Sequence, residues 1–356
     1  MENKKAGKKS ACEYEAYKNC NLCARRCGID RYFCTGYCGS SAELKVARAA
    51  LHFWEEPCIS GKSGSGAVFF EGCSLGCVFC QNYKLAHPQI NAVKKDPQIN
   101  SPSDCNIKKV QKTVNSVSIN AEKLSELFLK LEAQGANNIN LVTPTHYVPH
   151  IINAIELAKS RGIKIPFVYN TGTFETIETV KMLDGLIDVY MPDLKYYSSD
   201  ISAKYSNAPG YFETASQAIE EMYRQVGKNE FSTDIDRHRD STPDANKDGM
   251  ENVKIMKRGV LVRHMMLPGC VNDSKKVLEY LQKTYHDSIY ISIMSQYTPL
   301  HENLAEYPEL DKKVSMKRYE RLLDYAVSIG IVNAYIQEEP VSEESFIPEF
   351  DGTGVT

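Results

Sequence analysis

The 356-residue chain has little net charge and no long apolar run, and both absences exclude classes of protein. Lysine and arginine number 42 and aspartate and glutamate 45, which gives a formal net charge of −3. This balance argues against nucleic-acid binding through bulk positive charge. No stretch approaches the about 20 apolar residues of a membrane span. No apolar signal segment follows Met1. We therefore expect a cytoplasmic protein that binds no membrane, and the charge balance disfavours a nucleic-acid partner without excluding a local basic patch.

Cysteine, in contrast, is abundant and clustered. The chain has 12 cysteines, five of them between Cys20 and Cys38 and three between Cys73 and Cys80. A disulfide framework of this density is typical of small secreted domains. In a large intracellular chain, clustered cysteines more often bind metal.

Hydrophobic patterning divides the chain into three parts. Residues 1–60 are expected to hold a basic tail, a cysteine-rich metal-binding segment and a helix. The helix is predicted from the capping pair Ser40 and Glu43 and from the terminating Pro57. Between them, apolar residues recur at helical spacing: Leu44, Ala47, Leu51 and Trp54. Residues 61–338 are expected to form the core, with polar inserts at about 91–120 and 228–257. Residues 339–356 are expected to be a C-terminal tail.

Within the core, apolar strand-like segments alternate with helical patterns. The strands are expected at 67–70, 138–142, 165–169, 186–191, 259–263 and 288–293. The helices are expected near 121–134, 148–161, 174–183, 198–227, 273–284 and 314–329. This alternation predicts an α/β fold with a parallel sheet, closed into a barrel or partial barrel. In such a fold the chemistry takes place on the loops that follow the strands.

The strongest chemical signal follows the first of these strands. Cys73, Cys77 and Cys80 form a Cys-x3-Cys-x2-Cys motif in one loop. Three thiolates at this spacing bind three irons of a 4Fe–4S cluster. The fourth iron then remains open to the amino and carboxylate groups of a small molecule. The alternative is a structural zinc site with a fourth ligand elsewhere, although zinc sites usually use separated Cys-x2-Cys pairs.

With this motif, residues 65–335 resemble the radical S-adenosylmethionine enzymes, and most closely the pyruvate formate-lyase activating enzymes and their uncharacterised homologues. Further matches carry the resemblance: Phe79, Asn170-Thr171-Gly172, Asp193-Leu194-Lys195, and Arg263 with Pro268-Gly269 and Asp273. The resemblance implies a partial (β/α)6 barrel preceded here by the cysteine-rich extension. It also implies that Phe79, Asn170, Asp193, Lys195 and Arg263 contact S-adenosylmethionine. The sequence assigns no catalytic residue.

One family motif is missing. Many members carry Gly-Gly-Glu after the second strand, where it binds the amino group of the cofactor. This chain has Thr143-Pro144-Thr145-His146-Tyr147 there. We expect threonine hydroxyls, including that of Thr143, or backbone carbonyls to replace the glutamate, and His146 to donate to a substrate.

The N-terminal cysteines form a second set, of which four are enough for a metal centre. We expect Cys20, Cys23, Cys27 and Cys38 to bind zinc or a second iron–sulfur cluster. Zinc would stabilise a segment with little core of its own, whereas a cluster would relay electrons.

These observations lead to two hypotheses. In the first, the protein reductively cleaves S-adenosylmethionine and the 5′-deoxyadenosyl radical abstracts a hydrogen atom. The resemblance implies a flavodoxin- or ferredoxin-type electron donor and a glycyl-radical enzyme as the target. A peptide, a tRNA or a small metabolite is the alternative substrate. In the second hypothesis, the protein is a non-catalytic iron–sulfur or zinc-binding regulator.

Overall fold

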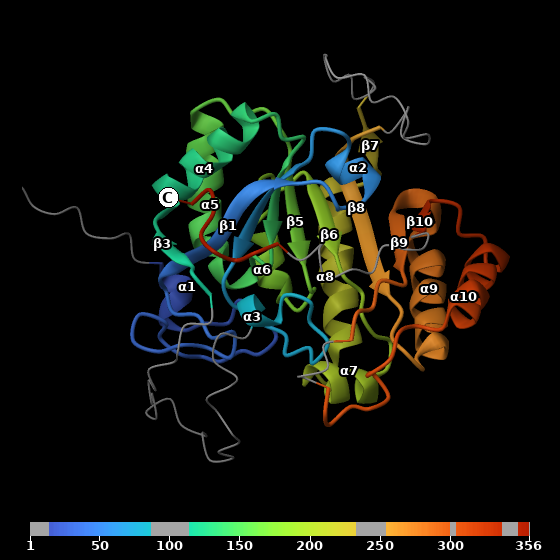
Figure 1. Cartoon of the computed structure of the whole chain (residues 1–356). Helices are drawn as coiled ribbons and strands as arrows, with labels where there is room; N and C mark the ends of the chain where they lie inside the picture. Colours follow the sequence, from blue (N-terminus) through green and yellow to red (C-terminus); the bar gives the residue numbers. More distant parts are fainter. Residues whose placement is uncertain (1–13, 87–113, 233–253, 300–303, 337–347, 356) are drawn as a thin grey trace, which may run out of the picture.

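The computed structural model describes residues 14–86, 114–232, 254–299, 304–336 and 348–355. Most of the two polar inserts, together with Cys12 and Cys105, lies outside the described residues. In Figure 1 a central sheet is flanked by helices on its outer face.

Seven parallel strands form the main part of the sheet. They are β2 Ser65–Phe70, β4 Ile139–Val142, β5 Phe167–Thr171, β6 Val189–Pro192, β8 Met256–Met265, β9 Tyr290–Met294 and β10 Ala334–Ile336. The strand order is β10-β9-β8-β6-β5-β4-β2-β1-β3. Because β10 and β3 stand at opposite ends of this order, the sheet is a partial barrel among the described residues. The first six parallel strands are those that the sequence predicts.

Three antiparallel strands extend this arrangement. They are β1 Leu44–His52, β3 Val117–Ile119 and β7 Glu230–Phe231. β1 pairs with both β2 and β3, and β7 pairs with β8. β3 and β7 belong to the described ends of the two polar inserts.

The helices follow the expected alternation. The larger ones are α4 Ala121–Ala133, α5 Val148–Ser160, α6 Ile177–Lys181, α7 Ser199–Ser206, α8 Tyr211–Val226, α9 Val271–Tyr285 and α10 Met316–Ser328. The short ones are α1 Glu15–Lys18, α2 Pro57–Ser60, α3 Tyr83–Ala86 and the 3-10 turns Thr145–Tyr147 and His286–Ser288. The single helical pattern expected over 198–227 is two helices, because Asn207 (φ 47°) and Gly210 (φ 70°) turn the chain between them.

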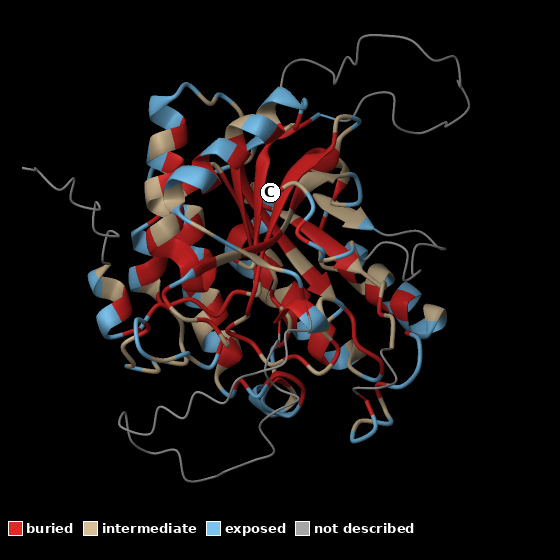
Figure 2. Cartoon of the chain, turned by 60° about the vertical axis from the view of Figure 1, so that its left-hand side comes forward, coloured by how far each residue is buried: buried red, intermediate tan, exposed pale blue. Residues whose placement is uncertain are grey.

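Apolar residues are buried on both faces of the sheet. Figure 2 shows the buried positions along the strands and on the inner sides of the helices. The main core lies between strands and helices, where for example Phe128 of α4 packs edge-on against Phe167 of β5 with ring centroids 5.3 Å apart. A smaller core lies inside the barrel and contains Val168, Met191 and Leu261.

The prediction of a helix between Ser40 and Pro57 is wrong, because residues 44–52 form strand β1. The β1–β2 register shifts between Val46 and Arg48, which marks a β-bulge. A bulge inserts one residue and breaks the two-residue alternation of a strand. The residues that suggested a helix face two different clusters: Leu44 packs in the main core, and Ala47 packs in a separate group with Ala67 and Phe69. Trp54, which that helix would have placed in the core, has 63% of its surface exposed.

The described part of the C-terminal tail packs against β1. The amide of Ala49 donates to the carbonyl of Thr353 (3.0 Å), and the amide of Gly352 donates to the carbonyl of Ala47 (2.9 Å). Val355 is buried in the main core. Residues 348–355 therefore belong to the folded domain, and we call them the C-terminal strap.

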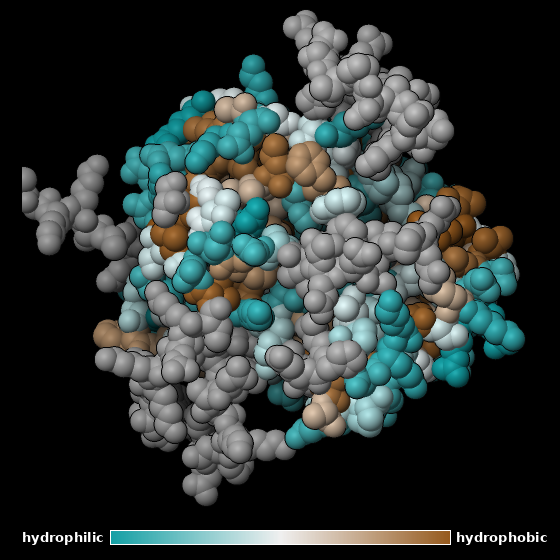
Figure 3. Space-filling model, in the orientation of Figure 1, coloured by the Kyte–Doolittle hydropathy of each residue, from teal (hydrophilic) through white to brown (hydrophobic). Residues whose placement is uncertain are grey.

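On the face shown in Figure 3, apolar areas alternate with hydrophilic ones. No helix in the described ranges is long and apolar enough to cross a membrane.

Candidate active site at the carboxyl ends of the strands

The loop with Cys73, Cys77 and Cys80 leaves the carboxyl end of β2 and is held against the end of α7. The amide of Gly76 donates to the carbonyl of Ser206 (3.3 Å), and the amide of Val78 donates to the carbonyl of Tyr205 (2.9 Å). These two backbone contacts fix the middle of the loop.

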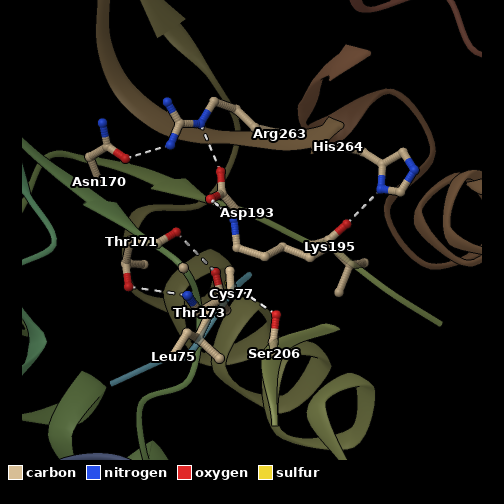
Figure 4. Close-up of polar contacts among 12 residues, drawn as sticks. Leu75, Cys77, Asn170, Thr171, Thr173, Asp193, Lys195, Ser206, Arg263 and His264 are labelled. Atoms are coloured by element: carbon tan, nitrogen blue, oxygen red, sulfur yellow. Dashed lines mark hydrogen bonds and ion pairs between the residues drawn. The ribbon is translucent and has the colours of Figure 1, made fainter. Parts of the chain in front are cut away.

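Two of the three thiols accept a hydrogen bond, and the backbone amide of Asn82 favours the thiolate of the third, Cys80. The amide of Leu75 donates to Cys73 Sγ (3.4 Å). The hydroxyl of Ser206 donates to Cys77 Sγ (2.9 Å; Figure 4). Such hydrogen bonds are the usual outer contacts of metal-bound thiolates.

Burial raises the pKa of all three thiols, to about 12 for Cys80, and their mutual repulsion adds to the shift for Cys73 and Cys80. They are therefore close enough for their charges to interact. A bound cation would offset that cost and leave them as thiolates. The donor set, the amide hydrogen bonds and this proximity fit a cluster bound by three cysteines.

A second group of polar side chains lies on the neighbouring strand ends. Asp193, just after β6, accepts from Lys195 Nζ (2.6 Å) and from Arg263 Nε (2.9 Å). Figure 4 shows the carboxylate between the two cations. Burial opposes its ionisation, but Arg263 and Lys195 outweigh burial and lower the pKa of Asp193. Asp193 and Lys195 are therefore both charged at neutral pH.

Arg263 reaches from β8 across the inside of the barrel. Its Nη2 donates to Asn170 Oδ1 (2.6 Å) and its Nη1 to Glu55 Oε2 (3.3 Å). Glu55 also accepts from the side-chain amides of Asn140 (3.0 Å) and Asn170 (3.4 Å). All three nitrogens of the guanidinium group thus contact protein groups. The sequence analysis did not predict that Glu55 is one of these partners.

The sequence analysis does not predict Glu55 as a site residue, because it assigns a helix to the segment that forms β1. The available signal was the acidic pair Glu55-Glu56 immediately before Pro57. Burial raises the pKa of both carboxyl groups, while Arg263 opposes that shift.

The other residues expected at the site are placed as follows. Thr143 directly follows β4 with φ 58°, a left-handed conformation that is unusual for threonine, and its amide donates to the carbonyl of Asn170 (2.8 Å). Phe79 is buried between Tyr196 and Tyr297, with both ring centroids 6.3 Å away.

The expectation that His146 donates to a substrate is not supported by its position. The side chain is buried, and its Nε2 lies 2.7 Å from the carbonyl oxygen of Glu71. Because a carbonyl only accepts, Nε2 is the donor there. Its proton therefore serves an internal hydrogen bond.

The four N-terminal cysteines also lie near one another. Cys20 and Cys38 are buried, and Cys20, Cys27 and Cys38 each add an electrostatic contribution that raises the pKa of Cys23, after the larger effect of burial. A Cβ on Gly36 would meet the sulfurs of Cys38 (3.5 Å) and Cys27 (3.7 Å). Cys34, the fifth cysteine of this segment, is disulfide-bonded.

Backbone amides also influence this second set. Burial raises the pKa of Cys20 and of Cys23, and the amides of Leu22 and Arg25, two residues further on, partly offset that rise. Among the described residues, no three histidine, cysteine or acidic side chains converge on one point suited to a single ion. In a 4Fe–4S cube the thiolates bind separate irons and need not converge.

The N-terminal segment is docked directly on the Cys73–Cys80 loop. The amide of Cys73 donates to the carbonyl of Cys38 (3.3 Å), and Arg25 Nε donates to the carbonyl of Ser74 (2.9 Å). Arg25 also donates to the carbonyls of Ser206 (3.2 Å) and Asn207 at the end of α7. One side chain therefore links the N-terminal segment, the loop and α7.

Residues 67–235 match the family model of the radical SAM superfamily. This part of the chain is similar to radical SAM domains. The matched range begins within β2 and includes the Cys73–Cys80 loop, Thr143, Asn170, Asp193 and Lys195. This match is the basis on which a 4Fe–4S cluster and S-adenosylmethionine are proposed below. Arg263 and the N-terminal cysteines lie outside the matched range.

Comparisons with individual proteins extend beyond the radical SAM domain. An uncharacterized protein of Methanocaldococcus jannaschii, MJ0674, is 24% identical over 313 residues, which cover 87% of this chain and 75% of that protein. Streptococcus suis SuiB, solved with S-adenosylmethionine, is similar over 75% of this chain and 48% of its own, with 12% identity and a TM-score of 0.43. The chain thus spans about half the length of SuiB. A domain of the pyruvate-formate lyase-activating enzyme of Bacteroides vulgatus is similar over 54% of this chain and 92% of its own, with 13% identity and a TM-score of 0.36.

Proposed function

We propose that this protein reductively cleaves S-adenosylmethionine and uses the resulting 5′-deoxyadenosyl radical to abstract a hydrogen atom. One electron enters the sulfonium, the bond from sulfur to the 5′ carbon breaks, and methionine leaves with the electron pair. The radical then takes a hydrogen atom and becomes 5′-deoxyadenosine. The observation that carries the proposal is the loop with three neighbouring buried thiols at the carboxyl end of β2, within the range that matches the radical SAM superfamily.

In this proposal Cys73, Cys77 and Cys80 hold the cluster, which supplies the electron when bound. Asp193 and Lys195 present opposite charges at the neighbouring strand end, which suits the amino and carboxylate groups of the methionyl moiety. Thr143 opens the segment that stands where many members of the family carry Gly-Gly-Glu. We assign its hydroxyl, or a carbonyl of this loop, to the cofactor amino group.

Phe79, Asn170 and Arg263 complete the proposed cofactor site. The ring of Phe79 lies in an aromatic group with Tyr196 and Tyr297, which suits stacking near the adenine. Because protein groups occupy all three ends of the guanidinium, we assign Arg263 the role of positioning Asp193 and Asn170, rather than that of binding a carboxylate directly.

The test is anaerobic reconstitution with iron and sulfide, followed by dithionite and S-adenosylmethionine. We expect about four irons for this site and formation of 5′-deoxyadenosine, both lost in the triple variant Cys73→Ala, Cys77→Ala, Cys80→Ala. The single variant Cys270→Ala is the matched control, because Cys270 lies at the start of α9 and outside both cysteine sets. A full cluster without any 5′-deoxyadenosine would favour a non-catalytic iron–sulfur regulator.

We further propose that Cys20, Cys23, Cys27 and Cys38 bind zinc or a second iron–sulfur cluster. The fully buried Arg31 supports this proposal. Its guanidinium lies over the ring of Tyr17 (4.4 Å), and no carboxylate of the described residues forms an ion pair with it. The groups of opposite charge that raise its pKa include Cys38 and Cys20. A tetrathiolate metal centre is anionic and would neutralise this buried charge.

Metal analysis separates the two possibilities for this centre. A Cys20→Ser, Cys38→Ser variant that keeps the irons of the first site but loses one zinc indicates a structural site. Loss of about four irons and of their visible absorption indicates a second cluster. An unchanged metal content would contradict the proposal.

For the substrate, we propose the Cα hydrogen of a glycine in a partner protein, with a flavodoxin- or ferredoxin-type protein as the electron donor. The support is the set of motifs that resemble the activating enzymes, Asn170-Thr171-Gly172 and Asp193-Leu194-Lys195. The test is to incubate the reduced protein with a glycyl-radical enzyme from the same organism and to record the doublet of a glycyl radical by electron paramagnetic resonance. Formation of 5′-deoxyadenosine without this signal would instead indicate a peptide, tRNA or small-molecule substrate.

A further inference from the structure

A chain of two hydroxyl groups leads to the middle cysteine of the loop. Tyr196 and Ser206 have their hydroxyl oxygens 2.5 Å apart, and Ser206 Oγ donates to Cys77 Sγ (2.9 Å). Because the single proton of Ser206 points to the sulfur, the hydrogen bond between the hydroxyls is donated by Tyr196. The chain therefore runs from Tyr196 through Ser206 to Cys77, and its last step is drawn in Figure 4.

This donor differs in kind from those on the other two thiols. Cys73 accepts from the backbone amide of Leu75 in its own loop, and the amide of Asn82 in the same loop favours the Cys80 thiolate. Amides of this kind accompany any similar turn of the backbone. The hydroxyl on Cys77 instead comes from a side chain 129 positions away, at the end of α7. It can therefore be removed without changing the loop.

The surroundings strengthen the interaction. Ser206 is fully buried, Tyr196 has 1% of its surface exposed, and Cys77 has 6%. A hydrogen bond in such a low-dielectric environment is electrostatically stronger than one in water, and connected donors polarise one another. The reduction potential of an iron–sulfur cluster depends on hydrogen bonds to its sulfurs and on solvent exposure.

We propose that Ser206, oriented by Tyr196, is a positioning residue that raises the reduction potential of the cluster through the Cys77 sulfur. The inference rests on the proposed function, because it requires a cluster on Cys73, Cys77 and Cys80. A donor on a thiolate withdraws electron density and stabilises the more negative, reduced cluster. Reduction before cleavage of S-adenosylmethionine is therefore favoured, while the hydroxyl itself touches neither the cofactor nor the reacting atoms.

The test is a redox titration of reconstituted protein, with the reduced cluster followed by electron paramagnetic resonance. We expect Ser206→Ala to shift the midpoint potential to more negative values and Tyr196→Phe to shift it in the same direction by less. Ser206→Thr, which keeps a hydroxyl, should restore much of the shift. Ser206→Ala leaves the carbonyl of residue 206 in place to accept from the Gly76 amide, so the loop stays anchored.

Ser202→Ala is the matched control. Ser202 lies one turn earlier on α7, is equally buried, and donates only to the carbonyls of Ser199 (3.0 Å) and Ala208 (2.8 Å). Its removal should leave the potential unchanged. An unchanged potential in Ser206→Ala with a full cluster would overturn the inference and leave the proposed function intact. If Ser206→Ala fails to assemble the cluster, Tyr196→Phe decides in the same way. A wild-type protein without any cluster would contradict the proposed function itself.

Discussion

Asp193 is the residue on which two half-buried cations converge, so its charge matters to the fold as well as to the site. Removing one member of a fully buried ion pair costs about 3–5 kcal/mol, whereas an exposed pair is worth less than about 1 kcal/mol. We therefore expect Asp193→Asn to lower the free energy of unfolding in urea by about 2 kcal/mol, between these limits. Asp184→Asn is the control, because Asp184 forms an ion pair of similar length (2.8 Å) with Arg224 on the surface. It should cost less than about 1 kcal/mol, and equal losses in the two variants would contradict the prediction.

His146 predicts a dependence of stability on pH. Burial, helped by the charge of Arg31, lowers its pKa to about 3, whereas in the unfolded chain it titrates near pH 6.5. The unfolded state therefore binds more protons below pH 6.5, and the stability present above that pH is lost as the pH falls toward 3. Between pH 6.5 and 5 the loss amounts to about 2 kcal/mol for this histidine.

The variant that isolates this effect is His146→Gln, which keeps a donor for the carbonyl of Glu71 and does not titrate. Its free energy of unfolding in urea should fall less than that of the wild type between pH 7 and pH 5. The prediction fails if both proteins lose the same stability over this interval.

Among the elements, six of the parallel strands can be predicted from the sequence, whereas strand β1 cannot. The residues of β4 and β5 are all buried, and short runs made mostly of apolar residues, such as these, stand out in a sequence. β1 contains a bulge and buries side chains on both faces, so neither a two-residue nor a helical period describes it. Its misassignment also concealed Glu55. The contact between Glu55 and Arg263 could therefore be identified only once the path of β1 in three dimensions was known.

The C-terminal strap depends on one glycine that lies against β1. Gly354 has φ 76°, and a Cβ there would lie 2.0 Å from the carbonyl oxygen of Ala49. We expect Gly354→Ala to detach the strap, which would be measured as faster proteolysis after residue 348 and a lower free energy of unfolding. Gly185→Ala is a close control, with the same φ of 76° and no atom within 4 Å of its Cβ. It should cost only the backbone strain, about 1 kcal/mol. Equal effects would show that the contact with Ala49 is unimportant.

For the molecule as a whole, the sequence predicts which elements carry chemistry but not how they meet. The Cys73–Cys80 motif and the pair Asp193–Lys195 were found from local spacing and from resemblance. The contact of Arg25 with Ser74 joins residues 49 positions apart, and no local pattern indicates it. The docking of the N-terminal segment on the loop is therefore a finding of the structure alone.

This docking predicts that Arg25 stabilises the Cys73–Cys80 loop. In Arg25→Ala the carbonyls of Ser74 and Ser206 lose their shared donor, so the amides of Gly76 and Val78 should exchange hydrogen for deuterium faster. Arg26→Ala, which changes an exposed neighbour, should leave this exchange at the wild-type rate. Protection that survives in Arg25→Ala would mean that the backbone contacts to α7 are sufficient without the guanidinium.

The short helix α2 limits how molecules can enter the barrel. It follows β1 at the amino ends of the parallel strands, and its residues Cys58 and Ile59 are fully buried among Val168, Val189 and Leu261 inside the barrel. These apolar side chains close the end of the barrel at which the parallel strands begin. Molecules that reach the interior must then enter past the rim that carries the cysteines or through the seam that the unclosed sheet leaves at its edge.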